Sequence, residues 1–165
     1  MKFSPRICGI VMLAAALISM AGCIPRWTAA ASRYAESTSL YSADDPSQQV
    51  TQASSGQHFL IVGMELSYTA TNPADIRSEL IFGLYDCYGD DVRYNNFYPA
   101  EGAVFDAIGF FAGKDTPLEG SIFFMVPDSF TADDAVLVVM NQSFDAIYSA
   151  SLASLEELTD YPGSW

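Results

Sequence analysis

The pattern of apolar and polar positions divides the chain into three regions. Residues 7–19 form one apolar run without a charged residue. Residues 24–57 are rich in Ala, Ser, Thr and Gln and show no sustained hydrophobic period. From residue 58 onward, short apolar or alternating runs are separated by turn residues. Runs of this kind are typical of β-strands, so the third region is predicted to be all-β.

The clearest strand pattern lies at residues 59–68. Its second half alternates, with Met64 and Leu66 on one side and Glu65 and Ser67 on the other, as expected when successive side chains point to opposite faces. Six or seven short strands separated by turns predict an immunoglobulin-like antiparallel β-sandwich. Further strands are expected at residues 80–85, 92–94, 103–111, 121–126, 135–140 and 147–152.

Local signals complete the predicted organisation of the chain. Residues 155–158 have the composition of one helical turn. Residues 33–41 could form a first strand at a sheet edge, or they could belong to a flexible segment. The predicted divisions are a signal peptide at 1–22, a tether at 23–56, the β-sandwich at 57–153 and a C-terminal tail at 154–165.

The N-terminal apolar run has the layout of a secretory signal. Lys2 and Arg6 precede it, and all 20 acidic residues lie after position 35. The run covers 13 residues, whereas a membrane-spanning helix needs about 20. This layout predicts a signal that directs export and is then removed.

The residues after this run resemble the bacterial lipobox, in which small residues precede an invariant Cys. The matching residues are Ser19-Met20-Ala21-Gly22-Cys23, with Met20 at the position where Leu is commonest. The resemblance implies cleavage between Gly22 and Cys23, and attachment of lipid (diacylglyceryl, with palmitate-type acyl chains) to the Cys23 thiol. An ordinary signal cleaved at the A-x-A-like site Ala29–Ala31 is the alternative.

Lipidation would place the protein on the extracytoplasmic face of a bacterial membrane. Stable attachment needs more than one acyl chain, which lipoprotein processing supplies. Ile24 follows Cys23, whereas an Asp at this position signals inner-membrane retention in enterobacteria-like systems. Sorting to an outer membrane is therefore allowed if the host has one.

Composition and charge exclude several classes of function. The chain has 7 Lys+Arg against 20 Asp+Glu, a net charge of -13, which disfavours nucleic acid as a partner because phosphate contacts need clustered Lys and Arg. Loss of Lys2 and Arg6 with the signal would make the charge -15. Three Cys and one His are too few for a Cys/His zinc site.

Cysteine usage predicts a domain without an internal disulfide. Cys8 would leave with the signal and Cys23 would carry lipid, so Cys87 remains alone. We expect Cys87 to be a small buried residue at a strand end; a reactive thiol is the alternative.

Two groups of residues are weak candidates for a site. Asp86, Asp90 and Asp91 crowd one predicted turn, with Glu101 and Asp106 in the next connection, and calcium prefers such oxygen ligands. Their spacing does not match an EF-hand, and acidic turns are usually solvated.

The second group is an aromatic segment at residues 94–99 that contains Tyr94, Phe97 and Tyr98. Aromatic and Asn side chains in a loop on a rigid sandwich are typical of binding surfaces. Alternatively, Phe97 and Tyr98 cap the core.

Catalysis has few candidate residues. His58 is the only histidine, no G-x-S-x-G motif occurs, and an exposed or edge position is expected for this histidine. No catalytic residue is therefore predicted, and a carboxylate-dependent hydrolase is an alternative class.

The stretch Gly113–Pro127 resembles the signature of a bacterial immunoglobulin-like family, often called telokin-like, whose function is unknown. Gly120, Phe124, Val126 and Pro127 match its spacing, although the turn from Gly113 to Gly120 is about two residues longer. The strand that ends in Asn72-Pro73 and the stretch Leu84-Tyr85-Asp86 followed by Gly89 also resemble features of this family. The resemblance covers roughly residues 57–142.

This resemblance implies an immunoglobulin-like fold behind a lipoprotein signal and implies no catalytic residue. The sequence as a whole predicts a membrane-anchored lipoprotein of the cell envelope that presents a protein-binding or envelope-interaction module. A structural or accessory envelope domain without a specific ligand is the main alternative, and a calcium-binding module is another.

Overall fold

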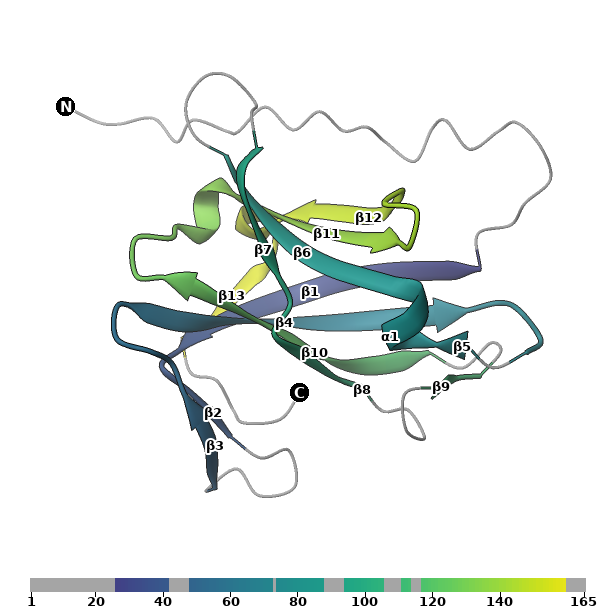
Figure 1. The fold of residues 1–165 in the computed structure, drawn as a ribbon, viewed down its shortest axis with the longest axis horizontal. Helices are drawn as coiled ribbons and strands as arrows, with labels where there is room; N and C mark the ends of the chain where they lie inside the picture. Colours follow the sequence, from purple (N-terminus) through teal and green to yellow (C-terminus); the bar gives the residue numbers. More distant parts are fainter. Residues whose placement is uncertain are drawn as a thin grey trace.

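The protein folds into two stacked β-sheets (Figure 1). A computed structural model describes residues 26–41, 48–72, 74–87, 94–105, 111–113 and 117–159. The larger sheet has the strand order β13-β1-β4-β10-β8, and the smaller has the order β12-β11-β6-β7. The prediction of an all-β sandwich is confirmed.

The five-stranded sheet is built around β4, which is antiparallel to β1 on one side and to β10 on the other. The short edge strand β8 is antiparallel to β10, and β13 runs parallel to β1. Its strands are β1 (Trp27–Ser37), β4 (Gln57–Tyr68), β8 (Gly102–Phe105), β10 (Leu118–Pro127) and β13 (Glu156–Leu158).

The four-stranded sheet is antiparallel throughout. Its strands are β6 (Leu80–Cys87), β7 (Tyr94–Pro99), β11 (Ala135–Asn141) and β12 (Ala146–Ser151). The remaining elements are the hairpin β2 (Ser39–Tyr41) and β3 (Gln49–Gln52), the pair β5 (Ala74–Asp75) and β9 (Phe111–Ala112), the helix α1 (Ile76–Glu79), and the 3-10 turns η1 (Ala132–Asp134) and η2 (Leu152–Ser154).

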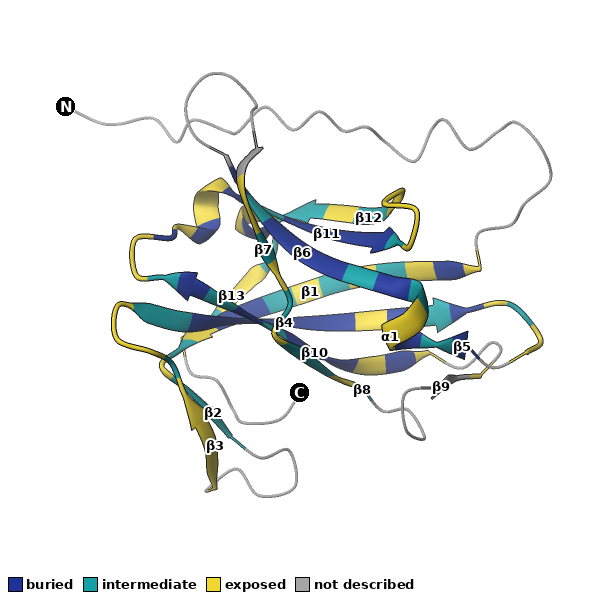
Figure 2. Cartoon of the chain, in the orientation of Figure 1, coloured by how far each residue is buried: buried dark blue, intermediate teal, exposed yellow. Residues whose placement is uncertain are grey.

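The core lies between the two sheets, where strand alternation turns every second side chain inward. Burial is concentrated in the central strands of the two sheets, whereas β3 is exposed along its length (Figure 2). Strand β10 ends at Pro127 as predicted, because proline has no N–H to donate to the ladder. The fully buried members of the core include Leu60, Val62 and Leu66 of β4, Leu84 of β6, Ile122, Phe124 and Val126 of β10, and Leu137 and Val139 of β11.

The prediction of a flexible tether is wrong for the part of residues 23–56 that forms β1. This strand pairs along its length with β4, and the alternative of a first strand at residues 33–41 was closer to the structure. Trp27 and Tyr34 are buried in the core. In a regular strand an odd and an even position would face opposite sides. A register shift between Ala31 and Arg33 lets Trp27 and Tyr34 both face the core.

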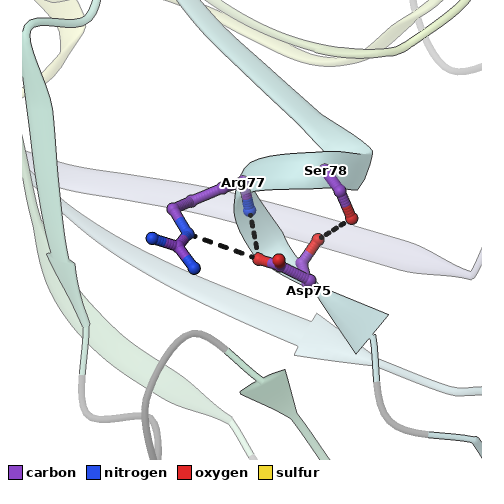
Figure 3. A network of polar contacts seen from close by, with 3 residues as sticks. All are labelled: Asp75, Arg77 and Ser78. Carbon is purple, nitrogen blue, oxygen red and sulfur yellow. Dashed lines mark hydrogen bonds and ion pairs between the residues drawn. The ribbon is translucent and has the colours of Figure 1, made fainter.

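Two further local predictions are wrong. Residues 94–99 form the strand β7 rather than a loop. Residues 156–158 pair with β1 as β13 rather than forming a helical turn, so part of the predicted tail belongs to the sheet. Helix α1 follows β5 directly, and Asp75 caps the helix by accepting the N–H of Arg77 at Oδ1, 3.0 Å away (Figure 3).

Candidate functional site

The predicted lipidation site, Gly22 and Cys23, lies outside the described residues. The sandwich begins at Trp27, only four positions after Cys23. Trp27 is held firmly there: its indole N–H donates to Glu79 Oε2 at 2.8 Å, and its ring packs on Tyr68 with centroids 4.6 Å apart. An acyl chain on Cys23 would therefore be attached very close to the folded domain.

The Asp86 side chain is buried and hydrogen-bonded within the sheet. It is 3% exposed, on the inward side of β6. Its Oδ1 accepts the backbone N–H of Asn96 at 2.7 Å, and its Oδ2 accepts Asn96 Nδ2 at 2.9 Å and the Tyr98 hydroxyl at 3.4 Å. Three donors thus surround the carboxylate, and these bonds fix β7 against β6.

Among the acidic residues that suggested calcium binding, the structure describes Asp86 and Glu101. Asp90, Asp91 and Asp106 lie outside the described residues. Within the described ranges, no group of three or more His, Cys, Asp or Glu side chains could hold a metal ion. Calcium binding therefore stays a prediction.

Phe97 and Tyr98 point to opposite sides of β7. Tyr98 packs against the core with its ring edge-on to Phe130, centroids 5.6 Å apart, so it caps the core. Phe97 faces outward, is 41% exposed, and lies against Tyr85 with centroids 5.0 Å apart. Its ring also covers Gly83, where a Cβ atom would collide with it. Tyr94 begins β7, and its side chain is outside the described part.

Phe97 belongs to an uncharged surface on the outer side of the four-stranded sheet. The cross-strand rows there are Val136–Tyr85–Phe97 and Val138–Gly83–Pro99, and Met140 pairs with Ile81. These residues alternate with the core residues of the same strands. In the part of this sheet that the structure describes, the outward positions of β6, β7 and β11 hold no charged residue. We call these eight residues the outer-face cluster. Gly83, Val138 and Met140 are buried within it, and Phe97 is its one exposed large hydrophobic side chain.

His58 is less exposed than predicted, because its side chain is only 12% accessible. Its Nδ1 lies 3.5 Å from Asp128 Oδ1 and its Nε2 lies 3.8 Å from Glu36 Oε2. The ring therefore sits between carboxylates of β1 and of the turn after β10. Cys87 ends β6 as predicted; its side chain is outside the described part.

Tyr34 is a buried group that the sequence analysis did not single out. Burial of the phenol, and then the Glu157 carboxylate beside it, raise the pKa of Tyr34 to about 12. The phenol is thus neutral at physiological pH, as suits a core residue. It marks the junction of β1 with β13, where Tyr34 pairs with Glu157.

The turn between β11 and β12 carries a second exposed aromatic residue that sequence analysis missed. Phe144 is 71% exposed and has a φ of +63°. The Asn141 side chain closes this turn by accepting the N–H groups of Ser143 and Asp145 at 2.8 and 3.0 Å. The Asn-Gln-Ser sequence could have indicated a turn, but nothing in it indicates an exposed Phe.

Comparison with known proteins gives a fold-level likeness only. No family model and no curated protein matches the sequence. The chain is similar in structure to an uncharacterized β-sandwich protein from Clostridium difficile 630, with 12% sequence identity and a TM-score of 0.46. The similarity covers 73% of this chain and 81% of that chain. Within the described residues, no helix has the length and apolar character to cross a membrane.

Proposed function

We propose that this protein is an exported lipoprotein, anchored to the bacterial envelope through Cys23, whose β-sandwich binds a protein partner. The lipobox resemblance at residues 19–23 supports the anchor. An immunoglobulin-like domain of the telokin-like kind would be the binding module. The partner would be another envelope protein that presents a neutral, apolar surface.

The outer-face cluster is the observation that carries the binding proposal. In a chain of net charge -13, a sheet face whose described outward positions are uncharged is unusual. Protein interfaces are depleted of charged residues at their centre and enriched in Tyr, Phe and Met. Phe97, with its ring held over Gly83 and beside Tyr85, is the exposed aromatic anchor of such a surface.

The anchor is tested by substituting the lipidated residue. We expect Cys23→Ser to move the protein from the membrane fraction to the soluble fraction, because no acyl chain can attach to serine. Cys8→Ser and Cys87→Ser are matched controls and should stay in the membrane fraction. Unchanged fractionation of Cys23→Ser would refute the anchor.

The binding surface is tested by cross-linking in intact envelopes followed by quantitative mass spectrometry. A partner enriched with the native protein should be lost with Phe97→Ser and retained with Val104→Ser. Val104 is a suitable control because it is 49% exposed and lies in β8 of the other sheet. Equal enrichment with both variants would refute this surface, and no enriched protein at all would favour a structural or accessory role.

A further inference from the structure

Phe144 occupies a backbone conformation that ordinarily suits glycine or asparagine. Its N–H donates to the Asn141 carbonyl at 3.0 Å, and Asn141 N–H donates to the Asp145 carbonyl at 3.0 Å. In hairpin loops of this kind, the residue after the turn takes a left-handed conformation. A bulky side chain is disfavoured there, yet this position carries an aromatic ring.

The ring gains no compensating burial within the domain, because Phe144 is 71% exposed. The turn is also rigid: Asn141 Nδ2 donates to Asp145 Oδ2 at 3.1 Å, in addition to the bonds that the Asn141 side chain accepts. An exposed ring on a strained, braced turn points to a role outside the fold. The location of the turn indicates what the Phe144 ring contacts.

The turn between β11 and β12, which contains Phe144, lies at the end of the sandwich where β1 begins, here called the Trp27 end (Figure 1). Hydrogen bonds and strand register give the same placement: Trp27 donates a hydrogen bond to Glu79, the next residue Leu80 pairs with Asn141, and Asn141 opens the turn. The Ala31 N–H also donates to the Tyr148 hydroxyl at 3.0 Å, which ties β1 to β12. The turn is exposed in Figure 2.

The distance along the chain from Cys23 limits how far this end can be from a bilayer. Four residues span at most about 14 Å when fully extended. The headgroup region of one leaflet is about 5–8 Å thick. The opposite end of β1, at Ser37, lies ten residues further along the strand, or about 33 Å away. A lipid on Cys23 would therefore hold the Trp27 end, and not the other end, beside the headgroups.

The distribution of charged side chains also favours the Trp27 end as the end that faces the headgroups. Of the three Lys or Arg residues that the structure describes, Arg26 and Arg77 lie exposed at the Trp27 end, and Arg33 lies within β1. Arg77 is 62% exposed and is paired with Asp75 at 3.6 Å (Figure 3). Asp75, Glu79 and Asp145 offset these two arginines at the Trp27 end. The opposite end carries the acidic residues Glu36, Asp128, Asp133 and Asp134, so phosphate headgroups would be repelled more strongly there.

We infer that the Trp27 end docks on the phospholipid surface, with Phe144 inserted among the headgroups as a second membrane contact beside the lipid on Cys23. This inference rests on the proposed lipidation. Aromatic side chains contribute to interfacial binding when their apolar faces enter the headgroup boundary. Phe97 is in register with Val136 of β11, five residues from Asn141, so it would then stand clear of the headgroups and exposed to a partner.

The test uses the full chain, lipidated in cells and reconstituted into vesicles of phosphatidylcholine with brominated acyl chains. Phe144→Trp and Val50→Trp each add one tryptophan to the same parent. Val50 is the matched control because it is 65% exposed in β3, beyond the far end of β1. We expect bromine to quench the fluorescence added at position 144 several-fold more than that added at position 50.

The mass of the N-terminal peptide separates the two possible failures. Lipidated protein with equal quenching at both positions would overturn the docked orientation and leave the anchor standing. A peptide without the diacylglyceryl mass would overturn the anchor and the orientation with it. Selective quenching at position 144 in lipidated protein supports both.

Discussion

At the scale of single residues, Asp86 shows how a side chain suggestive of metal binding can serve structure. Its position in an acidic segment suggested an exposed calcium ligand, yet its carboxylate is 3% exposed and accepts three hydrogen bonds. The sequence could not reveal this, because the donors belong to Asn96 and Tyr98 on a strand that resembled a loop. Asn95, Asn96 and Pro99 are residues typical of turns, and they concealed the alternation of β7.

Replacement of Asp86 by Ala should destabilise the fold by about 2–3 kcal/mol, because it removes three hydrogen bonds that Asn96 and Tyr98 donate to a buried carboxylate. Asp86→Asn keeps one acceptor oxygen and should have a smaller effect. Urea unfolding followed by circular dichroism measures both. Equal stability of Asp86→Ala and the native protein would show that these hydrogen bonds contribute little.

The same alternation explains the outcome for the aromatic pair. As members of a predicted loop, Phe97 and Tyr98 had the same two alternatives: both bind a partner, or both cap the core. In a strand, neighbouring side chains must point to opposite faces, so one caps the core and the other is exposed. The residue types indicated aromatic contact area, but only the strand assignment separates the two roles.

At the scale of elements, the strands with large apolar residues were predictable and β1 was not. Strands β4, β10 and β11 are rich in branched and aromatic residues, which favour strands intrinsically. Strand β1 has the sequence WTAAASRYAES, and alanine and serine have little strand preference. Its pairing with β4 and β13 supplies the stability that composition does not.

Gly120 lies where strands β10 and β8 approach each other closely. A Cβ atom there would collide with the Val104 carbonyl oxygen and lie 2.6 Å from Phe105 Cα, both backbone atoms of β8. Gly120→Ala should therefore destabilise the fold by about 1–3 kcal/mol, the usual range for overpacking. Gly113→Ala is the matched control, since no atom lies within 4 Å of its Cβ position.

Thermal unfolding of the two glycine variants gives the comparison. A lower melting temperature for Gly120→Ala alone would support close packing of β8 on β10 as the reason for glycine at this position. Equal melting temperatures would mean that β8 can move away at no cost. Gly120 was one of the residues that carried the family resemblance, and this packing gives it a physical reason.

At the scale of the whole molecule, the alternating pattern was sufficient to predict a two-layer β fold but not where the domain begins. The sandwich was expected to start near residue 57, after a tether that would lift it off a membrane. Instead β1 is an interior strand of the larger sheet. This change brings the folded domain to within four residues of Cys23, so that the proposed lipid on Cys23 would give the molecule a membrane-facing end.

The start of the domain can be tested with two soluble fragments. Residues 24–165 retain β1, whereas residues 57–165 lack it and with it Trp27, Tyr34 and the strand that pairs with β13. Loss of one large buried aromatic side chain typically removes about 3–5 kcal/mol, and a domain of this size has about 5–15 kcal/mol in total. We expect cooperative unfolding for the longer fragment and none for the shorter one, measured by circular dichroism on heating. A cooperative transition at the same temperature in both would restore the tether and remove the basis for a membrane-facing Trp27 end.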